Sequence, residues 1–341
     1  MNRVNRYLFS SFVSSFASLF ATLYIIVSMA FFIQMASLTS YIEITFAELG
    51  KMYLYIVPRT LLFTVPISFF VAVAMSFFRL SKENESIVIF TLGQSPKNIG
   101  AFFLKAASLL SLLLLLDAIV VIPYAHTLNE NFKDYKKTRI SLNIKPGEFG
   151  QKFGDWKVFI GGAHDENGTT FYDDLAMYNH EKEGEKIVLA KSGEIVNTGE
   201  GMELRLKGGI TYNISEPNWN VAEFGSMVMR AFFESKANEN HSFIEYWKVA
   251  KSDEGRAEDL TIFALLALFP IASVLFGIAF GVVTYRYEKG IVYFGVFGVL
   301  IGYFSMIMAF AQHPFIAVPI VFALTFALSV ATFKHKVLRK Y

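Results

Sequence analysis

Six long apolar runs divide this chain, three of them before residue 125 and three after residue 259. Each is about 20 residues long or longer, the length that a helix needs to cross a hydrocarbon core of roughly 30 Å. The first run exceeds the roughly 7–15 residues of a signal-peptide core, so we expect it to remain as a membrane helix. The predicted spans lie near residues 8–36, 53–78, 102–122, 260–285, 291–310 and 315–333.

Between the third and fourth runs, residues 125–259 are polar and carry the pattern of β-strands. Asn129–Arg139 reads as a charged continuation of the third helix. From Met202, the text M-E-L-R-L-K-G-G-I-T-Y-N-I-S alternates apolar and polar residues on both sides of Gly208-Gly209, which predicts a hairpin with a two-residue turn. Other short strands are expected to begin at Trp156, Thr170 and Lys186. The insert is therefore predicted to be all-β, an antiparallel sandwich or a jelly-roll-like domain.

The fold class that follows is an α-helical membrane protein with six transmembrane helices and an inserted all-β domain. Its parts are residues 1–124, with three spans and a charged helix near 81–93, residues 125–259, the β domain, and residues 260–341, with three spans and a tail. Lys and Arg gather in cytoplasmic loops of membrane proteins. Both termini and the loop from Arg79 to Asn98 are rich in them, whereas the opposite short loops hold only Lys51. We expect those basic segments in the cytoplasm and the β domain on the far side.

Composition supports the membrane class and excludes several others. Hydrophobic residues make up 54% of the chain and charged residues 18%, against about 25% charged in soluble domains. The net charge of +2 favours no nucleic-acid partner. Cysteine is absent, which removes disulfides, thiolate metal sites and cysteine nucleophiles. His164, His180 and His241 are scattered without ligand spacing, so we expect surface histidines, no catalytic set, no metal and no cofactor.

Charges inside the predicted spans are few, and such charges mark function by default. Arg59 is interpreted either as snorkelling to the interface or as binding an anionic headgroup. Asp117 is interpreted as interfacial or helix-paired in preference to a proton relay. With so few intramembrane charges, an ion pump or proton-coupled transporter is disfavoured. Small residues in the fourth and fifth spans would permit close helix contact, namely Gly277, Gly281, Gly295, Gly298 and Gly302.

The charged text between the second and third spans is R-L-S-K-E-N-E-S-I-V-I-F-T-L-G-Q-S-P-K-N. Ser81 is expected to cap a helix whose first turn carries Glu83 and Glu85, where the helix dipole favours acids. Gly93 with Pro96 is expected to end it. The helix either lies on the membrane surface or couples the chain to a separate ATPase. Any ATPase must be separate because the chain lacks the G-x-x-x-x-G-K-[ST] phosphate loop.

A family resemblance rests on three parts of the sequence. They are this loop text, the V-P-x-x-x-x-x-x-x-P of the second helix, and K-I-V-L-A-K-S-G-E-I-V with M-E-L-R-L-K-G-G-I-T-Y in the insert. Over nearly its whole length the chain resembles the lipopolysaccharide-export permeases of the LptF/LptG type. The resemblance implies a non-enzymatic permease subunit of an ATP-binding cassette transporter in a bacterial inner membrane, which extracts lipopolysaccharide and passes it through its periplasmic β domain. The implied partners are a cytoplasmic ATPase dimer, a paralogous second permease, periplasmic bridge jellyroll proteins, a single-span accessory subunit and lipopolysaccharide.

Carried over by position, the resemblance implies site residues of two kinds. For ATPase coupling these are Glu83, Glu85, Ser86 and Gly93, and for lipid binding Arg59, Gln34, Lys133, Lys136 and Lys137. The chain departs from the family where Gln34 or Met35 replaces a basic residue found in some members, and where Glu258 lacks the basic pair that often follows. The F-F-x-Q text around Gln34 leans toward the LptF side.

Two other functions compete with this interpretation. A mechanotransmission or regulatory subunit would move its exported domain without transporting lipid, and it would need the coupling helix but no continuous apolar path. An intramembrane protease would need a Ser/His set or paired aspartates within the spans. Asp117 stands alone there, and His126 and His313 lie at helix ends, so the protease is disfavoured.

Overall fold

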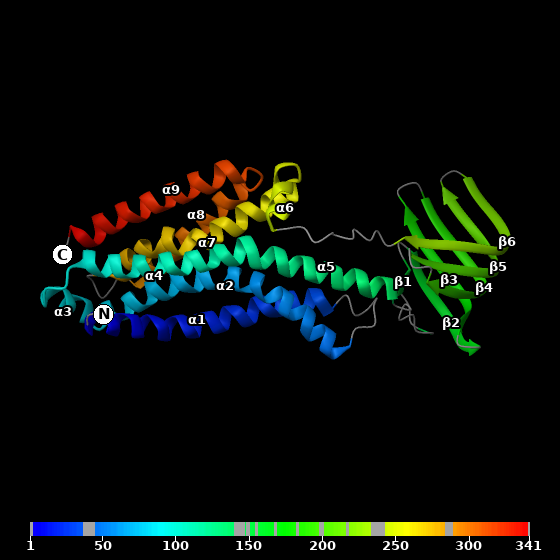
Figure 1. The fold of residues 1–341 in the computed structure, drawn as a ribbon, viewed down its shortest axis with the longest axis horizontal. Coiled ribbons are helices and arrows are strands. Elements are labelled where there is room, and N and C mark those ends of the chain that lie inside the picture. Colours follow the sequence, from blue (N-terminus) through cyan, green and yellow to red (C-terminus); the bar gives the residue numbers. More distant parts are fainter. Residues whose placement is uncertain are drawn as a thin grey trace. The chain divides into compact units, whose positions relative to one another are not determined.

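A computed structural model describes the chain in two units (Figure 1). The membrane unit comprises residues 1–31, 54–127 and 240–341, and the β unit comprises residues 32–53 and 128–239. Each unit is described by itself. The described residues are 3–36, 45–139, 147, 151–153, 156–166, 169–181, 184–197, 201–215, 218–232, 243–283 and 289–339.

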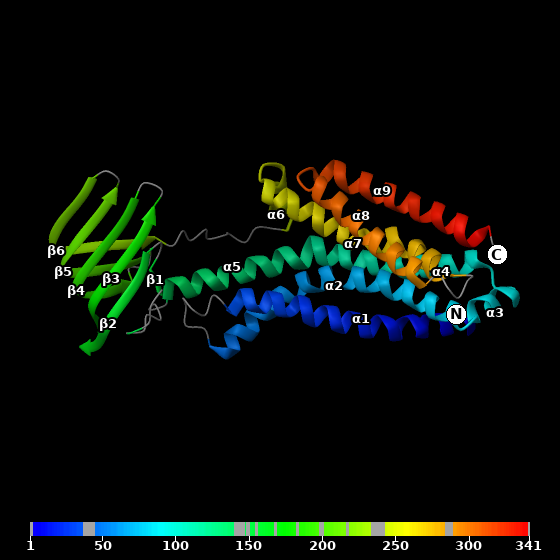
Figure 2. The same ribbon diagram turned by 180° about the vertical axis from the view of Figure 1, so that it is seen from behind.

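Within the described residues, six helices are long and apolar enough to cross a membrane, and they match the six predicted spans. They include α1 (Arg3–Ala36), α2 (Phe46–Lys82), α4 (Pro96–Leu116), α7 (Glu254–Gly281), α8 (Lys289–Ala309) and α9 (Pro314–Phe333). The third span continues from α4 through a π-helical segment, η2 (Asp117–Val121), into α5 (Ile122–Arg139), so the predicted charged continuation is confirmed. The shorter helices are α3 (Glu85–Thr91), α6 (Phe243–Lys248), η3 (Val249–Lys251) and η4 (Lys334–Leu338). The start of α1 and the end of α9 lie at the same end of the membrane unit as α3 (Figure 2).

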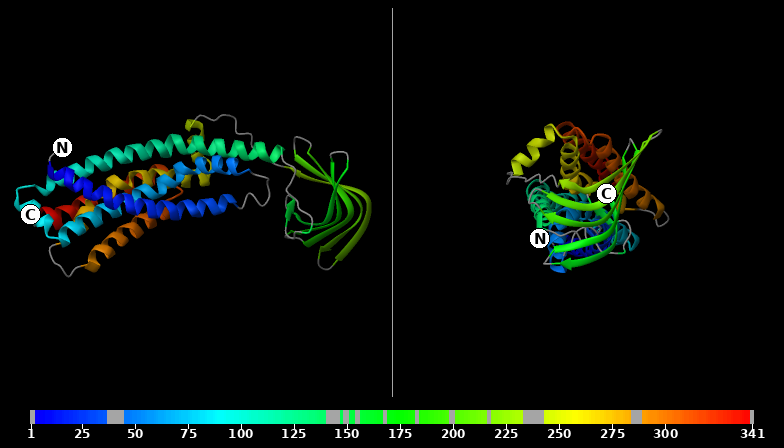
Figure 3. Two further views of the ribbon diagram at one scale, coloured as in Figure 1. Left: turned by 90° about the horizontal axis from the view of Figure 1, so that it is seen from below. Right: turned by 90° about the vertical axis from the view of Figure 1, so that its right-hand side faces the viewer.

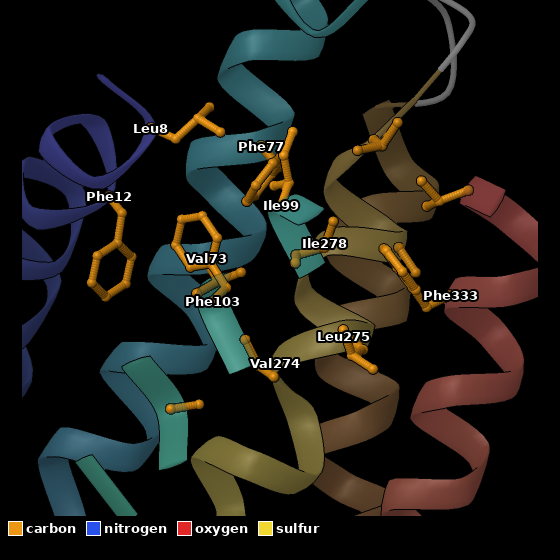
Figure 4. Close-up of a cluster of buried hydrophobic side chains, with 14 of the residues drawn as sticks. Leu8, Phe12, Val73, Phe77, Ile99, Phe103, Val274, Leu275, Ile278 and Phe333 are labelled. Carbon is orange, nitrogen blue, oxygen red and sulfur yellow. The ribbon is translucent and has the colours of Figure 1, made fainter. Parts of the chain in front are cut away.

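Helix α7 is the most buried of the six spans, and it is apolar on every side, as expected of a helix enclosed by others. Close contact with α2 depends on the predicted G-x-x-x-G. A Cβ added at Gly277 would lie 2.9 Å from Val73 Cγ1, and one added at Gly281 would lie 2.5 Å from Phe77 Cβ. Figure 4 shows Val73 and Phe77 among the side chains of this core. The prediction of close helix packing at these glycines is confirmed.

Helix α1 packs differently, since its fully buried side chains lie near its start. Among its described side chains, residues 3–34, the buried ones are Leu8, Ser11 and Phe12. The Phe12 ring lies edge-on to Phe69 and Phe103, at centroid distances of 5.2 and 5.8 Å. Figure 4 shows Phe12 and Phe103. Beyond residue 12, α1 contributes no buried residue up to residue 34, so most of its length faces outward.

The inserted β unit holds an antiparallel meander in which every strand pairs with its neighbours in sequence. Its strands are β1 (Gln151–Phe153), β2 (Trp156–Glu166), β3 (Thr169–Glu181), β4 (Gly184–Asn197), β5 (Gly201–Ser215) and β6 (Asn218–Phe232). The predicted strands at Trp156, Thr170 and Lys186 are confirmed. The sheet is strongly curved (Figure 3), and one face carries a buried cluster that includes Ile160, Leu175 and Leu206.

The curvature is associated with a line that crosses five strands, which we call the crease. It is formed by Gly161, Asp174, Lys191, Gly208 and Gly225, which fall between ladder pairs in every strand from β2 to β6. At the crease the buried side of a strand changes parity: Tyr172 is buried before Asp174, and Leu175 and Met177 after it. Asp174 and Gly208 have positive φ angles of 52° and 58°.

The crease corrects one prediction. Gly208-Gly209 is no hairpin turn, because β5 runs without interruption from Gly201 to Ser215. The alternation on its two sides arises because the pleat inverts at Gly208, whose positive φ suits glycine. Gly209 is needed for space, since an added Cβ would overlap Leu189 O and lie 2.5 Å from the Phe224 ring. The crease divides the sheet into a first leaf (157–160, 175–181, 185–190, 209–215, 218–224) and a second leaf (162–166, 169–173, 192–197, 201–207, 226–232).

Candidate functional site

Helix α3 is the charged helix that the sequence places between the second and third spans. It begins at Glu85 instead of near residue 81, so the prediction that Ser81 is its N-cap is wrong. Helix α2 continues to Lys82 because no glycine or proline follows Pro66 before that point. The chain then turns at Asn84, with φ 60°, a left-handed conformation that Asn tolerates better than most residues.

The end of α3 follows the prediction closely. Gly93 has a φ of 88° and donates its backbone N–H to Phe90 O at 3.0 Å, while Gln94 donates to Ile89 O at 3.3 Å. These two bonds form a Schellman motif, in which a glycine in the left-handed conformation ends the helix. Gly93 therefore shapes the end of α3, and Pro96 starts α4 directly afterwards.

Ser86 is buried and fixes α3 to the end of α2. Its hydroxyl donates to Ser81 Oγ at 3.1 Å, and Ser81 Oγ also accepts from the backbone N–H of Val283, just after α7, at 3.3 Å. Both serines are less than a tenth exposed, so satisfying their hydroxyls matters for stability. Ser81 thus serves as the junction of three helices.

Glu85 lies on the side of α3 that faces the start of α1. The Tyr7 hydroxyl donates to Glu85 Oε2 at 2.6 Å, and a hollow of about 450 Å³ beside this bond is lined by Arg3, Val4, Tyr7, Glu83, Asn84, Glu85, Val88 and Ile89. One turn further along α1, Arg79 donates to Ser11 Oγ at 2.6 Å. The sequence analysis missed Tyr7 and Ser11, and the basic flank at Arg3 and Arg6 gave no sign of them.

Arg59, the basic residue of the second span, lies among aromatic rings and one acid. Its guanidinium is 4.0 Å from Asp259 Oδ1 and lies over the rings of Phe263 and Phe31, at 5.5 and 6.0 Å from their centroids. The side chain is 45% exposed, which leaves part of the guanidinium open to an anion. Asp259, which follows the Glu258 noted in the sequence, was not predicted.

Helix α6 covers the π-helical segment of the third span. Trp247 donates its indole N–H to Ile119 O at 3.0 Å, in the segment whose wider turns alter the usual backbone pairing. Arg256 lies over the Tyr246 ring at 4.0 Å from its centroid. The pKa of Tyr246 is raised above its ordinary value of 10, because the effect of burial exceeds the opposing effect of the Arg256 charge. Asp117 begins the same π-helical segment, and its Oδ2 is buried without a hydrogen-bond partner among the described residues.

The other predicted lipid-binding residues are less well defined. Gln34 is exposed near the end of α1. Lys133, Lys136 and Lys137 lie on α5, as their charged-helix context predicted, but their side chains fall outside the described residues. The structure brings Glu83, Glu85 and Ser86 together on and just before α3, and it places Arg59 on another helix, α2.

The first leaf of the sheet carries apolar side chains on both faces, and the charged residues Lys157, Glu185 and Glu223 also lie on its outer face, the one away from the core cluster. On the face away from the core cluster, one cross-strand row runs through Phe159, Ala176, Leu189, Ile210 and Glu223. The row lines a hollow of about 750 Å³ together with the crease residues Asp174, Lys191, Gly208 and Gly225. The next rows on that face include Val221 and Trp219, which are 59% and 74% exposed. The outer face of the first leaf therefore forms an exposed apolar surface.

The second leaf shows the opposite character on the same face. Arg205 and Arg230 both bind Glu203, at 3.1 and 2.9 Å. The hydrogen bond from Arg230, followed by that from Arg205, lowers the pKa of Glu203 below its ordinary value of 4.5. His164 pairs with Asp173 at 2.8 Å on two neighbouring strands. This leaf is an ordinary solvated surface, so the apolar character of the first leaf is specific to it.

A further hollow of about 380 Å³ lies in the membrane unit among α7, α8 and α9. Gly298 and Gly302 line it, and an added Cβ at either would meet nothing within 4 Å. Thr325 also lines it and is buried, with no hydrogen-bond partner for its hydroxyl in the described part of the chain. The hollow is otherwise hydrocarbon in character.

Comparison with known proteins adds one match. The family model described as "Lipopolysaccharide export system permease LptF/LptG" matches residues 6–335. That range contains α1 from Arg6 onward, the other five long helices and the whole sheet. Among curated proteins, no sequence matches the chain.

Proposed function

Since the chain belongs to the LptF/LptG family of lipopolysaccharide export permeases, we propose that it extracts lipopolysaccharide from the inner membrane and passes it through its β domain toward the outer membrane. The family makes the chain a transporter subunit and no enzyme. The route through the β domain, the partners and the orientation in the membrane belong to the proposal.

The physical demand on such a protein is to keep hydrocarbon out of water. Removing an acyl chain from a bilayer costs about 0.8 kcal/mol per CH₂, so a chain of about 14 carbons costs roughly 10 kcal/mol. A lipid with several chains must therefore move from one apolar surface directly to another. The permease needs an apolar site outside the membrane as well as within it.

The observation that carries this proposal is the hollow of about 750 Å³ on the first leaf. Its floor is formed by Phe159, Ala176, Leu189 and Ile210, and charged Asp174, Lys191 and Glu223 flank it. An apolar floor with polar groups at its margin suits a ligand that has acyl chains and a charged headgroup. A subunit that only transmitted motion would need no such surface, so the hollow favours transport over mechanotransmission.

The proposal assigns the remaining groups as follows. Helix α3 binds a separate cytoplasmic ATPase dimer and is the coupling helix of the permease. Glu83 lies just before this helix and Glu85 is its first residue. Arg59 and, further along the lipid's course, Gln34, Lys133, Lys136 and Lys137 face lipid headgroups, because lysine and arginine are the usual phosphate partners. A second permease, a single-span accessory subunit and bridge proteins complete the transporter. Both termini are cytoplasmic and the β domain is periplasmic, following the Lys and Arg distribution.

The test is photo-crosslinking of lipopolysaccharide in the ATPase-containing complex. A photoreactive residue is placed at Leu189 in the hollow, at core-facing Leu206, or at Val228, which is 50% exposed on the second leaf. We expect ATP-dependent lipid adducts at Leu189 or Leu206 and none at Val228. Absence of adducts at both Leu189 and Leu206, in a complex that hydrolyses ATP, would contradict the proposed route.

A further inference from the structure

The start of α1 is held by two polar contacts as well as by its buried core residues. Tyr7 donates to Glu85 on α3 at 2.6 Å, and Arg79 on α2 donates to Ser11 at 2.6 Å. Bonds to a charged group at this distance are stronger than neutral ones. From Val13 to Gln34 no side chain of the helix is fully buried, and Phe16 and Leu19 pack only partly buried against the core, so this part resists displacement less than the start does. The contacts near residues 7–12 therefore determine the position of α1.

Of these contacts, Tyr7 alone joins α1 to α3 by a side-chain hydrogen bond within the described residues. The Arg79–Ser11 bond joins α1 to α2, and Ser86 joins α3 to α2 through Ser81. A movement of α3 relative to α2 therefore reaches α1 through the Tyr7–Glu85 bond, because a hollow separates the helices beside it. The Arg79–Ser11 bond, one turn away, resists translation and acts as the pivot.

We propose that Tyr7 is a positioning residue that transmits the movement of α3 to α1 during each ATPase cycle. The inference rests on the proposed function, because it needs an ATPase that moves α3. Glu85 then has two roles: its backbone belongs to the helix that the ATPase moves, and its carboxylate holds the phenol of Tyr7. Tyr7 touches neither lipid nor nucleotide, and it acts through Glu85.

The proposal explains why the phenol ring is not buried. Tyr7 is 50% exposed, so its ring contributes less to the packing of α1 than Leu8 or Phe12. Removing the hydroxyl should leave insertion and packing intact and remove the link alone. This separates a positioning role from a structural one.

The experiment uses the full complex with its ATPase in proteoliposomes that contain lipopolysaccharide. Tyr7→Phe is compared with Tyr293→Phe, which removes a phenol hydroxyl from α8 where the ring is 56% exposed. Two rates are measured, ATP hydrolysis and lipopolysaccharide release. We expect Tyr7→Phe to keep the hydrolysis rate and to release about fivefold less lipid per ATP, the change that loss of one such bond produces in a two-state population. Tyr293→Phe should match the wild type.

A second measurement reports the link itself. Because the chain has no cysteine, Arg3→Cys with Val88→Cys gives a unique pair of spin-label sites on exposed residues at the two sides of the hollow. We expect one narrow distance distribution during turnover with Tyr7 and a broadened one with Tyr7→Phe. Glu85→Gln should stay narrow, since its amide oxygen still accepts from Tyr7.

The outcomes separate cleanly. Unchanged lipid release per ATP and an unchanged distance distribution in Tyr7→Phe would overturn the role of Tyr7, and so would a parallel fall in hydrolysis and release, which indicates damaged packing. A wild-type complex that hydrolysed ATP but released no lipopolysaccharide would count against the proposed function. In that case the label distances would still decide whether Tyr7 joins α1 to α3.

Discussion

At the scale of single residues, the glycines of the membrane unit differ sharply in what surrounds them. Gly277 and Gly281 lie against Val73 and Phe77 of α2, and their missing side chains let two backbones approach. Gly298 lies in open space on α8. The spacing in the sequence marks all of these residues as possible contact sites, but only the structure shows which of them have a neighbour within this chain.

This contrast gives a matched pair of substitutions. Gly281→Ala places a Cβ 2.5 Å from Phe77 Cβ and 2.6 Å from Ala74 O, so α2 and α7 must move apart. We expect a loss of about 1–3 kcal/mol, the usual cost of overpacking. Gly298→Ala meets nothing and gains helix propensity, so it should be neutral or slightly stabilising. The measurement is the thermal unfolding midpoint of the purified, solubilised protein. Equal losses in the two variants would refute the packing argument.

The candidate site was predictable where its residues act locally. Gly93 ends α3 through bonds to Phe90 and Ile89, and the short-range pattern of the loop contains that information. The bond between Tyr7 and Glu85 joins positions 78 residues apart, and the contact of Arg59 with Asp259 spans two separate helices. Such pairs depend on how helices pack, and no spacing within one segment encodes them.

At the scale of elements, the β domain shows how a correct pattern can support a wrong element. Alternation on both sides of Gly208-Gly209 identifies strands correctly, and a glycine pair between strands usually indicates a turn. The same alternation results when one long strand inverts its pleat at a positive φ. The information that separates the two cases lies in neighbouring strands, since Asp174 and Lys191 take part in the same crease.

The crease can be tested at one position. Gly208→Val forces a β-branched residue to a φ of 58°, which strongly disfavours the native backbone. We expect roughly 1–3 kcal/mol of destabilisation, confined to the sheet. Gly225→Val is the control, because Gly225 also lies on the crease but has no positive φ and no atom within 4 Å of an added Cβ. Hydrogen exchange of β4 and β5 amides in the full protein would report the difference. Equal protection in both variants would contradict the need for glycine at position 208.

At the scale of the whole molecule, the membrane unit combines a fixed centre with one weakly held helix. Helix α7 is enclosed by α2, α4, α8 and α9, and its carbonyl at Leu265 and N–H at Phe276 bond to side chains of α8 and α9. Helix α1 has buried side chains only from Leu8 to Phe12 among its described residues. Under the proposed function, a permease that admits a lipid from the side needs one wall that moves while the rest stays, and we propose α1 as that wall.

The attachment of α1 can be measured by truncating side chains along it. Phe12→Ala removes a ring that contacts Phe69 and Phe103, so it leaves a cavity at the attachment. In a water-soluble protein, a Phe→Ala change in the core lowers the free energy of unfolding by about 3–5 kcal/mol. In a membrane protein the surrounding lipid is as apolar as the lost contact, so only the loss of packing contributes, and we expect a decrease of roughly 1–3 kcal/mol. Ile25→Ala, at a position 64% exposed, should cost nothing measurable. Thermal unfolding of the solubilised protein compares the two, and protease cleavage near the start of α1 should increase for Phe12→Ala alone. If Ile25→Ala were as costly as Phe12→Ala, α1 would pack along its whole length and could not serve as the moving wall.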